Sequence, residues 1–185
     1  YTTLDEALGA GTVEVGEVSK AGRVPHLKVI NKGGEMLFIM AGEQLIGAKQ
    51  NRVVNASTML GPKGEWTIDV SCVERGRWGY VSRNFRGDNS SSHAKLRRMM
   101  LRKAAAAYRH EGRPGSDQGA VWREVDRKLA MMGSRSPSAA LHQAFEDHGL
   151  DLERTCRQLP APLGCCGAVF AIGGRIAGVE FFDMP

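Results

Sequence analysis

The order in which strand-like and helix-like patterns follow one another is the feature that most constrains the fold of this chain. Short segments of the first third alternate apolar and polar residues and end at turn-forming sequences such as Gly33-Gly34. This pattern is typical of β-strands. The segments expected to be strands are residues 12–18, 26–30, 36–40, 52–60 and 66–73.

The middle of the chain changes to helical periodicity. Serines 90–92 can cap a helix over residues 93–110, Asp117 can cap a second over 118–132, and Pro137 suits the first turn of a third that runs to about 149.

Two further strands, residues 167–172 and 176–182, are joined by Gly173-Gly174, which is typical of a β-hairpin. Strands, then helices, then a returning hairpin predict an α+β fold. We expect a mainly antiparallel sheet with a central block of about three helices packed on one side.

Length and composition predict a single domain over residues 1–185. A chain of 185 residues with 42% hydrophobic residues can bury a core of ordinary size. The chain starts at Tyr1 without Met and stops just after a strand expected to be buried, so we expect it to be a fragment of a slightly longer protein. No apolar run approaches the roughly 20 residues that span a bilayer, and no signal peptide is recognisable, so we expect a cytoplasmic protein without a membrane partner.

Positive charge is concentrated in one part of the chain. Residues 75–109 contain ten Lys or Arg and one acid, Asp88, a local net charge of +9 within a total of +5. Such a segment can attract nucleic acid or a multiply phosphorylated small molecule. It can equally be the solvated surface of a helix, and the sequence leaves both interpretations open.

Residues 42–52 gather one acid, two cations and three side-chain amides around Gly42 and Gly47, at the end of an expected strand. Binding groups are commonly placed on such loops. Glu43 is the candidate general acid or base of this segment. The candidate ligand-binding residues here are Lys49, Gln50, Asn51, Arg52 and, in the following strand, Asn55.

A second group follows the strand that ends near residue 73. Glu74 can supply an acid or base, Arg77 can hold phosphate through its planar fork, and Trp78 can stack on a base. The alternative is a Glu–Arg salt bridge beside a half-buried Trp. Further candidates for ligand binding are Arg97, Gln118 and Glu180, the last because it interrupts an apolar strand.

Familiar cofactor and metal signatures are missing from the sequence. Its glycines do not form a dinucleotide or phosphate-binding loop, and its five histidines are scattered without ligand spacing. The sequence therefore predicts no metal site, assigns no cofactor and leaves the oligomeric state open.

The same motifs resemble those of a known family. Residues 42–55, 71–78, 118–122 and 178–183, taken in order, are similar to the ARG-and-rhodanese-phosphatase-superfamily-associated protein domain, in which ARG stands for ADP-ribosylglycohydrolase. The resemblance implies a role near ADP-ribose and NAD metabolism. It implies no particular reaction and transfers no catalytic residues.

We therefore expect an intracellular domain that binds or processes an ADP-ribose-like, NAD-derived or other phosphorylated nucleotide. The alternative is a non-enzymatic module that binds nucleic acid or a partner protein through residues 75–109. In a third interpretation, the polar motifs are scaffold and hold strand ends together. The sequence does not decide whether the chain is an enzyme.

Overall fold

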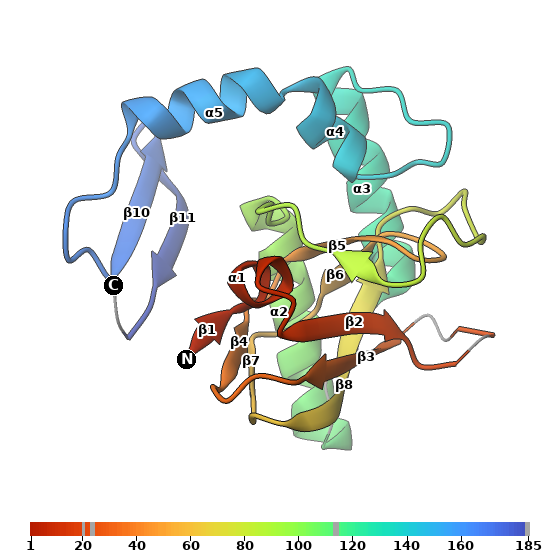
Figure 1. Ribbon diagram of the computed structural model, residues 1–185. Helices are drawn as coiled ribbons and strands as arrows, with labels where there is room; N and C mark the ends of the chain where they lie inside the picture. The colour runs from red at the N-terminus through yellow and green to blue at the C-terminus, as the bar shows by residue number, and fades with distance from the viewer. Residues whose placement is uncertain (20, 23–24, 113–114, 184–185) are drawn as a thin grey trace. The chain divides into compact units, whose positions relative to one another are not determined.

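The computed structural model describes residues 1–19, 21–22, 25–112 and 115–183 (Figure 1). The chain divides into two compact units, Tyr1–Asp147 and His148–Pro185. Five helices and eleven mostly antiparallel strands lie within the described residues, which confirms the predicted α+β fold. None of these helices is both long and apolar enough to cross a membrane.

A six-stranded antiparallel sheet forms the centre of the first unit. In spatial order its strands are β2 (Val13–Glu17), β3 (His26–Asn31), β8 (Gly64–Cys72), β6 (Arg52–Val54), β5 (Gln44–Gly47) and β9 (Phe85–Arg86). The two edge strands contact each other without a described ladder between them. At this seam a Cβ on Gly16 of β2 would lie 3.6 Å from Asn84 Oδ1, just before β9. The sheet therefore curls until its edges meet.

A smaller sheet accompanies the first one. It contains β1 (Thr2–Thr3), β4 (Leu37–Ile39) and β7 (Thr58–Leu60), with β1 parallel and β7 antiparallel to β4. Helix α1 (Leu4–Gly9) follows β1 directly and begins with a capping box between Thr3 and Glu6. Its residues Leu4 and Ala7 are buried in a core shared with both sheets.

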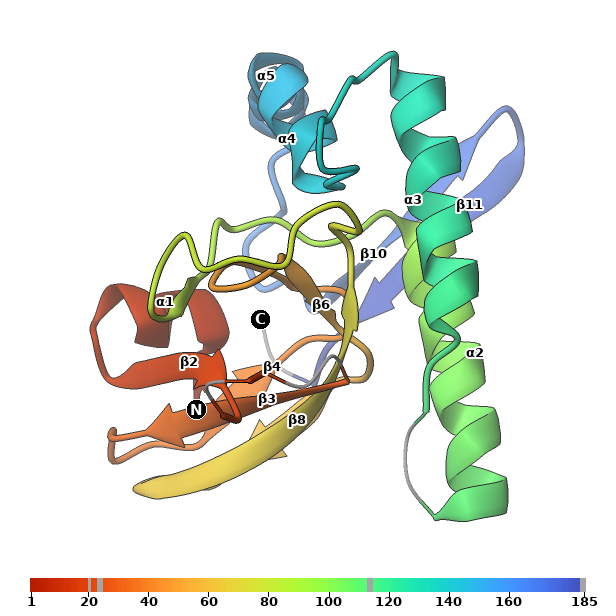
Figure 2. The same ribbon diagram turned by 90° about the vertical axis from the view of Figure 1, so that its right-hand side faces the viewer.

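The long helices cover the opposite face of the central sheet. Helices α2 (Ala94–Glu111) and α3 (Gln118–Met132) lie together on one side of β8, as Figure 2 shows, and the short α4 (His142–Asp147) contacts α3. Adjacent residues of β6 face different cores, since Val53 packs with these helices and Val54 packs with the α1 side. Strand β6 is therefore buried on both faces, which holds the loops at its ends in fixed positions.

The expectation of one strand over residues 52–60 is wrong. The segment breaks into β6 and β7, which belong to different sheets. The polar residues between them bond elsewhere: Asn55 accepts a hydrogen bond from Ser71 Oγ at 2.7 Å, and Ser57 Oγ accepts one from the Ala41 N–H at 2.9 Å. These side-chain contacts compete with continuation of the ladder.

The expected helix over residues 136–149 is also wrong in its extent. Residues 136–141 form turns, and the Leu141 N–H donates to the Val73 carbonyl at 2.9 Å. Ala140 forms an isolated bridge with Glu74. These contacts hold the segment in a non-helical conformation, so α4 begins only at His142. The helices expected at 93–110 and 118–132 are confirmed as α2 and α3.

The second unit contains α5 (Gly149–Gln158), which the sequence did not predict, and the expected hairpin of β10 (Gly167–Ile172) and β11 (Arg175–Phe181). The Gly173-Gly174 turn is confirmed, and both glycines have positive φ. Within the second unit taken by itself, the last strand is not buried as the sequence predicts. Two strands and one helix cannot enclose a core of their own, and none of the described residues 148–183 is buried.

Candidate functional site

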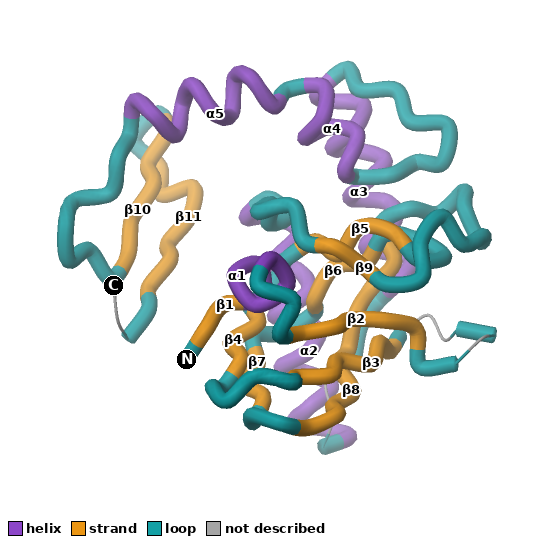
Figure 3. Tube along the Cα trace, in the orientation of Figure 1, coloured by secondary structure: helices purple, strands orange, loops and turns teal. Residues whose placement is uncertain are grey.

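A cleft of about 540 Å³ in the first unit contains part of the sequence-predicted site. Three of the predicted residues, Asn51, Glu74 and Arg77, lie in its wall. Other polar residues in the lining are Ser82, Asn84, Arg86, Ser136, Ser138, His142, Gln143 and Glu146. The wall is built from the end of β5 and the loop that follows it, the loop after β8 (shown in Figure 3), β9 and the segment from 136 to α4.

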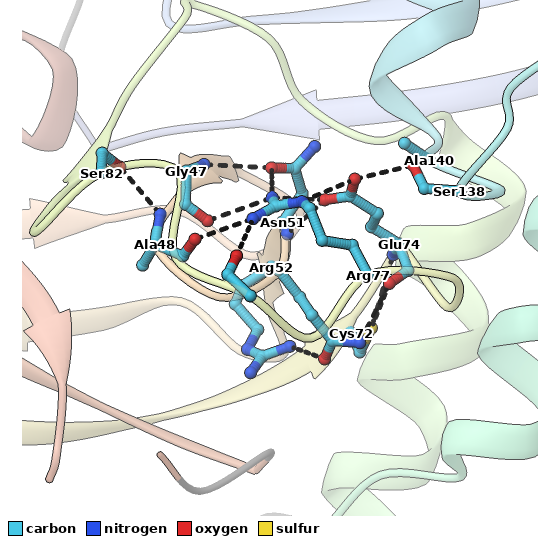
Figure 4. Close-up of polar contacts among 12 residues, drawn as sticks. Gly47, Ala48, Asn51, Arg52, Cys72, Glu74, Arg77, Ser82, Ser138 and Ala140 are labelled. Atoms are coloured by element: carbon cyan, nitrogen blue, oxygen red, sulfur yellow. Dashed lines mark hydrogen bonds and ion pairs between the residues drawn. The ribbon is translucent and has the colours of Figure 1, made fainter. Parts of the chain in front are cut away.

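Every N–H group of the Arg77 guanidinium donates a hydrogen bond to an acceptor of the protein (Figure 4). Its Nε donates to Glu74 Oε1 at 2.9 Å, and its Nη2 donates to Glu74 Oε2 at 2.5 Å. The remaining acceptors are Asn51 Oδ1 and the carbonyl oxygens of Gly47, Ala48 and Gly79, at 2.7–3.3 Å. Because a guanidinium has five donors, Arg77 can bind an incoming phosphate only by giving up protein contacts.

The Glu74 carboxylate is likewise fully hydrogen-bonded within the protein. Its side chain is 7% exposed and also accepts hydrogen bonds from the Asn51 N–H at 3.0 Å and from Ser138 Oγ at 2.7 Å. Burial alone would raise the pKa of Glu74, but the hydrogen bonds from Arg77, Ser138 and Asn51 outweigh it and lower the pKa. An ionised carboxylate with four donors is a poor proton donor. This geometry favours the salt-bridge interpretation of the motif.

Three predicted amides connect parts of the scaffold. Gln118 makes a pair of 2.8 Å hydrogen bonds with the backbone N–H and carbonyl of Cys72, and so attaches the start of α3 to the end of β8. Gln50 donates to the Glu74 carbonyl at 3.1 Å and accepts from Arg52 at 2.6 Å. Asn55 is buried against Ser71. These amides satisfy buried polar groups within the fold.

A second group of predicted residues lies around the ring of Trp78. Lys49 Nζ is 5.0 Å and Arg52 Cζ is 5.6 Å from that ring, and Lys49 Nζ is also 5.1 Å from the ring of Tyr80. Such distances are typical of cation–π contacts. Arg52 is fully buried, and its Nη2 lies 3.7 Å from the carboxylate of Glu17. Burial lowers the pKa of Arg52.

Glu43 and Arg97 lie near the start of α2. Glu43 accepts a hydrogen bond from the Met40 N–H at 3.1 Å, and burial raises its pKa to about 7. Glu43 therefore has the proton affinity of a general acid or base but is not part of the cleft lining, where Glu74 lies. Burial also lowers the pKa of Arg97, whose methylene groups pass over Gly42. A Cβ on Gly42 would come within 2.2 Å of Arg97 Cδ, and the φ of +92° also favours glycine.

Glu180 belongs to the second unit. It pairs with Ala168 in the hairpin and is half-buried. Within its own unit neither face of the hairpin is covered, so this unit alone does not enclose the carboxylate in a core strand.

The sequence did not identify three residues of the cleft region. His142 Nδ1 lies 2.8 Å from Asp88 Oδ2, and Asp88 also accepts hydrogen bonds from the backbone and hydroxyl of Ser90. Asp88 raises the pKa of His142, which favours the imidazolium form. Arg86 of β9 is exposed in the cleft, and no ion pair of Arg86 is present among the described residues. The only sequence feature that pointed to this group of residues was Asp88, because it is the single acid within the basic segment 75–109.

The basic segment does not form one uninterrupted positive surface. Acids of α3 neutralise several of its members: Arg75 pairs with Asp126 at 3.2 Å, Lys95 with Glu124 at 2.9 Å and Lys103 with Asp117 at 3.7 Å. Glu124 also pairs with His93 and Arg127. No group of three or more His, Cys, Asp or Glu side chains among the described residues is arranged to hold a metal ion.

Comparison with known proteins identifies the family. A family model described as the ARG and Rhodanese-Phosphatase-superfamily-associated Protein domain matches residues 1–185. No curated protein and no solved structure shows significant similarity to the chain. Since the family model covers the whole chain, this protein belongs to the family of ARG and rhodanese-phosphatase-superfamily-associated protein domains.

Proposed function

We propose that the cleft around Arg86 and His142 binds the phosphate groups of an ADP-ribose-like or other phosphorylated nucleotide. The single observation that carries the proposal is Arg86. It is an exposed guanidinium in a polar cleft, and no described residue neutralises it in an ion pair. A planar guanidinium matches the geometry of phosphate oxygens.

The surroundings of Arg86 support an anion as the ligand. His142 carries a positive charge below its raised pKa, while the charges of Arg77 and Glu74 balance each other. Side chains that can donate to a phosphate, such as Ser136 and Gln143, lie in the same wall. The opposing group is Glu146, whose carboxylate is 56% exposed and 3.4 Å from His142 Nε2. The family name, which refers to ADP-ribosylglycohydrolase, supports a ligand of the ADP-ribose class.

The proposal concerns binding, because neither of the two carboxylates that the sequence suggested as acid or base has both the required pKa and the required position. Glu43 has a pKa of about 7 but lies outside the cleft lining, and Glu74 lies in the lining but its pKa is lowered. The alternative of nucleic-acid binding through residues 75–109 has less support, because α3 neutralises part of that charge.

Isothermal titration calorimetry with pyrophosphate and with ADP-ribose tests the proposal. We expect Arg86→Ala to weaken both by about tenfold to a hundredfold, the loss typical of one charge-assisted contact. Arg98→Ala is the matched control, because Arg98 is exposed on α2 and absent from the cleft lining. Glu146→Gln should tighten binding of both anions. Undetectable binding of pyrophosphate, or equal losses in the two Arg variants, would refute the proposal.

The pH dependence gives a second readout. The pKa of His142 is raised by Asp88, so its positive charge is present at low pH and is lost as pH rises through that pKa. Pyrophosphate should therefore bind more tightly at pH 6 than at pH 9 in calorimetry at constant ionic strength. Asp88→Asn should move this transition to lower pH, because it removes the charge that stabilises the imidazolium. A flat pH profile would contradict the role of His142.

A further inference from the structure

Asp88 and His142 are placed as the two members of an acid–base pair. His142 begins α4, and its Nδ1 is buried and lies 2.8 Å from Asp88 Oδ2 in the loop after β9. The two side chains are largely enclosed, with exposed fractions of 14% for His142 and 10% for Asp88. A carboxylate at one ring nitrogen orients an imidazole, so the other nitrogen is the one that can exchange a proton with a ligand.

The Asp88 carboxylate is itself held in position. Ser90 donates to Asp88 Oδ1 through its backbone N–H at 3.1 Å and through its hydroxyl at 2.6 Å. The Ser90 hydroxyl in turn accepts a hydrogen bond from Gln44 Nε2 of β5 at 2.7 Å. A Cβ on Gly87, the residue before Asp88, would overlap the carboxylate of Asp5 in α1, so this loop also packs closely against α1. Such support keeps a site group in a fixed geometry.

The second ring nitrogen of His142 lies beside residues of the cleft wall. Nε2 is 3.4 Å from Oε1 of the exposed Glu146, and His142, Glu146 and Arg86 all line the cleft. Asp88 raises the pKa of His142 most, Glu146 adds to this effect, and burial and the charge of Arg86 oppose it. The imidazolium therefore persists to higher pH than in an ordinary histidine and can donate a proton inside the cleft.

We propose that this cleft is the active site of a phosphodiesterase, in which Nε2 of His142 donates a proton to the leaving oxygen of a phosphodiester held by Arg86. The inference rests on the proposed function, because it requires a phosphate group beside Arg86. A phosphodiester needs such a donor, since its leaving alkoxide is strongly basic and its phosphate carries no proton of its own. Asp88 is a positioning residue, which orients and charges the imidazole without touching the ligand.

The reaction is hydrolysis. Water attacks phosphorus and forms a new P–O bond, while the bond from phosphorus to the leaving oxygen breaks and leaves its electron pair on that oxygen. The Nε2 proton of His142 moves to the leaving oxygen, which departs as an alcohol. The attacking water keeps one proton as part of the phosphomonoester product and gives up the other, which restores the imidazolium.

Hydrolysis of two aryl phosphodiesters tests the proton donor. The leaving group of bis(4-nitrophenyl) phosphate is weakly basic and needs little proton donation, whereas that of diphenyl phosphate is more basic. We expect His142→Gln to lower kcat for diphenyl phosphate by about a hundredfold or more, the usual contribution of general acid catalysis, and to lower kcat for bis(4-nitrophenyl) phosphate much less. His110→Gln is the matched control, because His110 is exposed on α2 and absent from the cleft lining.

The pH profile of kcat tests the positioning role of Asp88. Because protonated His142 is the active form, kcat should fall as pH rises through the pKa of His142. Asp88→Asn should move this fall to lower pH, since the imidazolium loses its main stabilising charge, and Asp88→Glu should restore part of the shift. A profile that keeps its position in Asp88→Asn would contradict the positioning role, even if kcat is reduced.

The outcomes separate this inference from the phosphate site. No hydrolysis of either diester by the wild-type protein, or an equal loss of kcat on both diesters in His142→Gln, would overturn the role of His142 as proton donor. If circular dichroism shows that His142→Gln does not fold, the pH profiles of wild type and Asp88→Asn still decide the question. Pyrophosphate binding that is lost in Arg86→Ala would uphold the phosphate site by itself.

Discussion

Arg77 and Glu74 show how the role of a residue depends on the partners that surround it. The sequence suggested a phosphate clamp and a general acid or base. In the structure the two side chains form a bidentate pair, and the other donors of Arg77 bind the 47–51 loop. Arg86, which sequence analysis did not identify, is exposed and can donate hydrogen bonds to a ligand, whereas the donors of Arg77 are bonded to the protein.

Glu43 gives a testable pH dependence at the same scale. Burial raises its pKa from an ordinary 4.5 to about 7 in the folded protein. The folded state therefore holds the proton more tightly, so stability falls as pH rises from the unfolded pKa through the folded one. Glu43→Gln mimics the protonated acid and should stabilise the protein at pH 8 by on the order of 2 kcal/mol, with little effect at pH 4.

Urea unfolding of wild type and Glu43→Gln at the two pH values measures this difference. Glu35→Gln, on an exposed side chain, should show no comparable change with pH. A stability difference independent of pH would show that Glu43 has the same pKa in the folded and unfolded states, which contradicts the raised pKa.

At the scale of elements, the long helices are attached to the sheet by polar contacts as well as by apolar packing. Val121 and Val125 of α3 pack with Val53 and Val73 in one core. Gln118, the first residue of α3, additionally pairs with the Cys72 backbone at the end of β8. The apolar stripe selects the face of the helix, and Gln118 sets its position along the strand.

Gln118→Ala should therefore lower the free energy of unfolding by about 1–3 kcal/mol, because the buried Cys72 N–H loses its acceptor. Chemical denaturation measures the loss, with Gln158→Ala at the exposed end of α5 as the control. Equal stability of the two variants would mean that apolar packing alone positions α3.

At the scale of the whole molecule, the two units differ in their means of stabilisation. Residues 1–147 contain both hydrophobic cores and all residues that line the cleft around Arg86 and His142. None of the described residues 148–183 is buried. The first unit therefore has the requirements for independent folding, and the second does not.

A chain that ends at Asp147 should unfold cooperatively and bind pyrophosphate with the affinity of the full chain. Circular dichroism during thermal unfolding and calorimetry check the two parts of this prediction. A separate peptide of residues 148–185 should show no cooperative transition. Failure of residues 1–147 to fold would show that the first unit requires the second for its stability.

The sequence by itself determined the classes of the elements and their order. The period-2 and helical patterns in residues 12–18, 94–110 and 167–182 depend only on residues close together in the sequence. The type of each of these elements can therefore be predicted from the sequence alone. The sequence also placed Glu74 and Arg77 together correctly, since they are three residues apart, and left open the salt bridge that the structure contains.

Only the tertiary structure decided which polar groups satisfy one another and which remain available. The break at Asn55 and the delayed start of α4 depend on partners far along the chain, Ser71 and Val73. Likewise, Asp88 and His142 are far apart in the sequence and pair because the tertiary structure brings β9 and α4 to the same cleft. Hydrogen bonding and burial are properties of three-dimensional neighbours, and a sequence pattern records only neighbours along the chain.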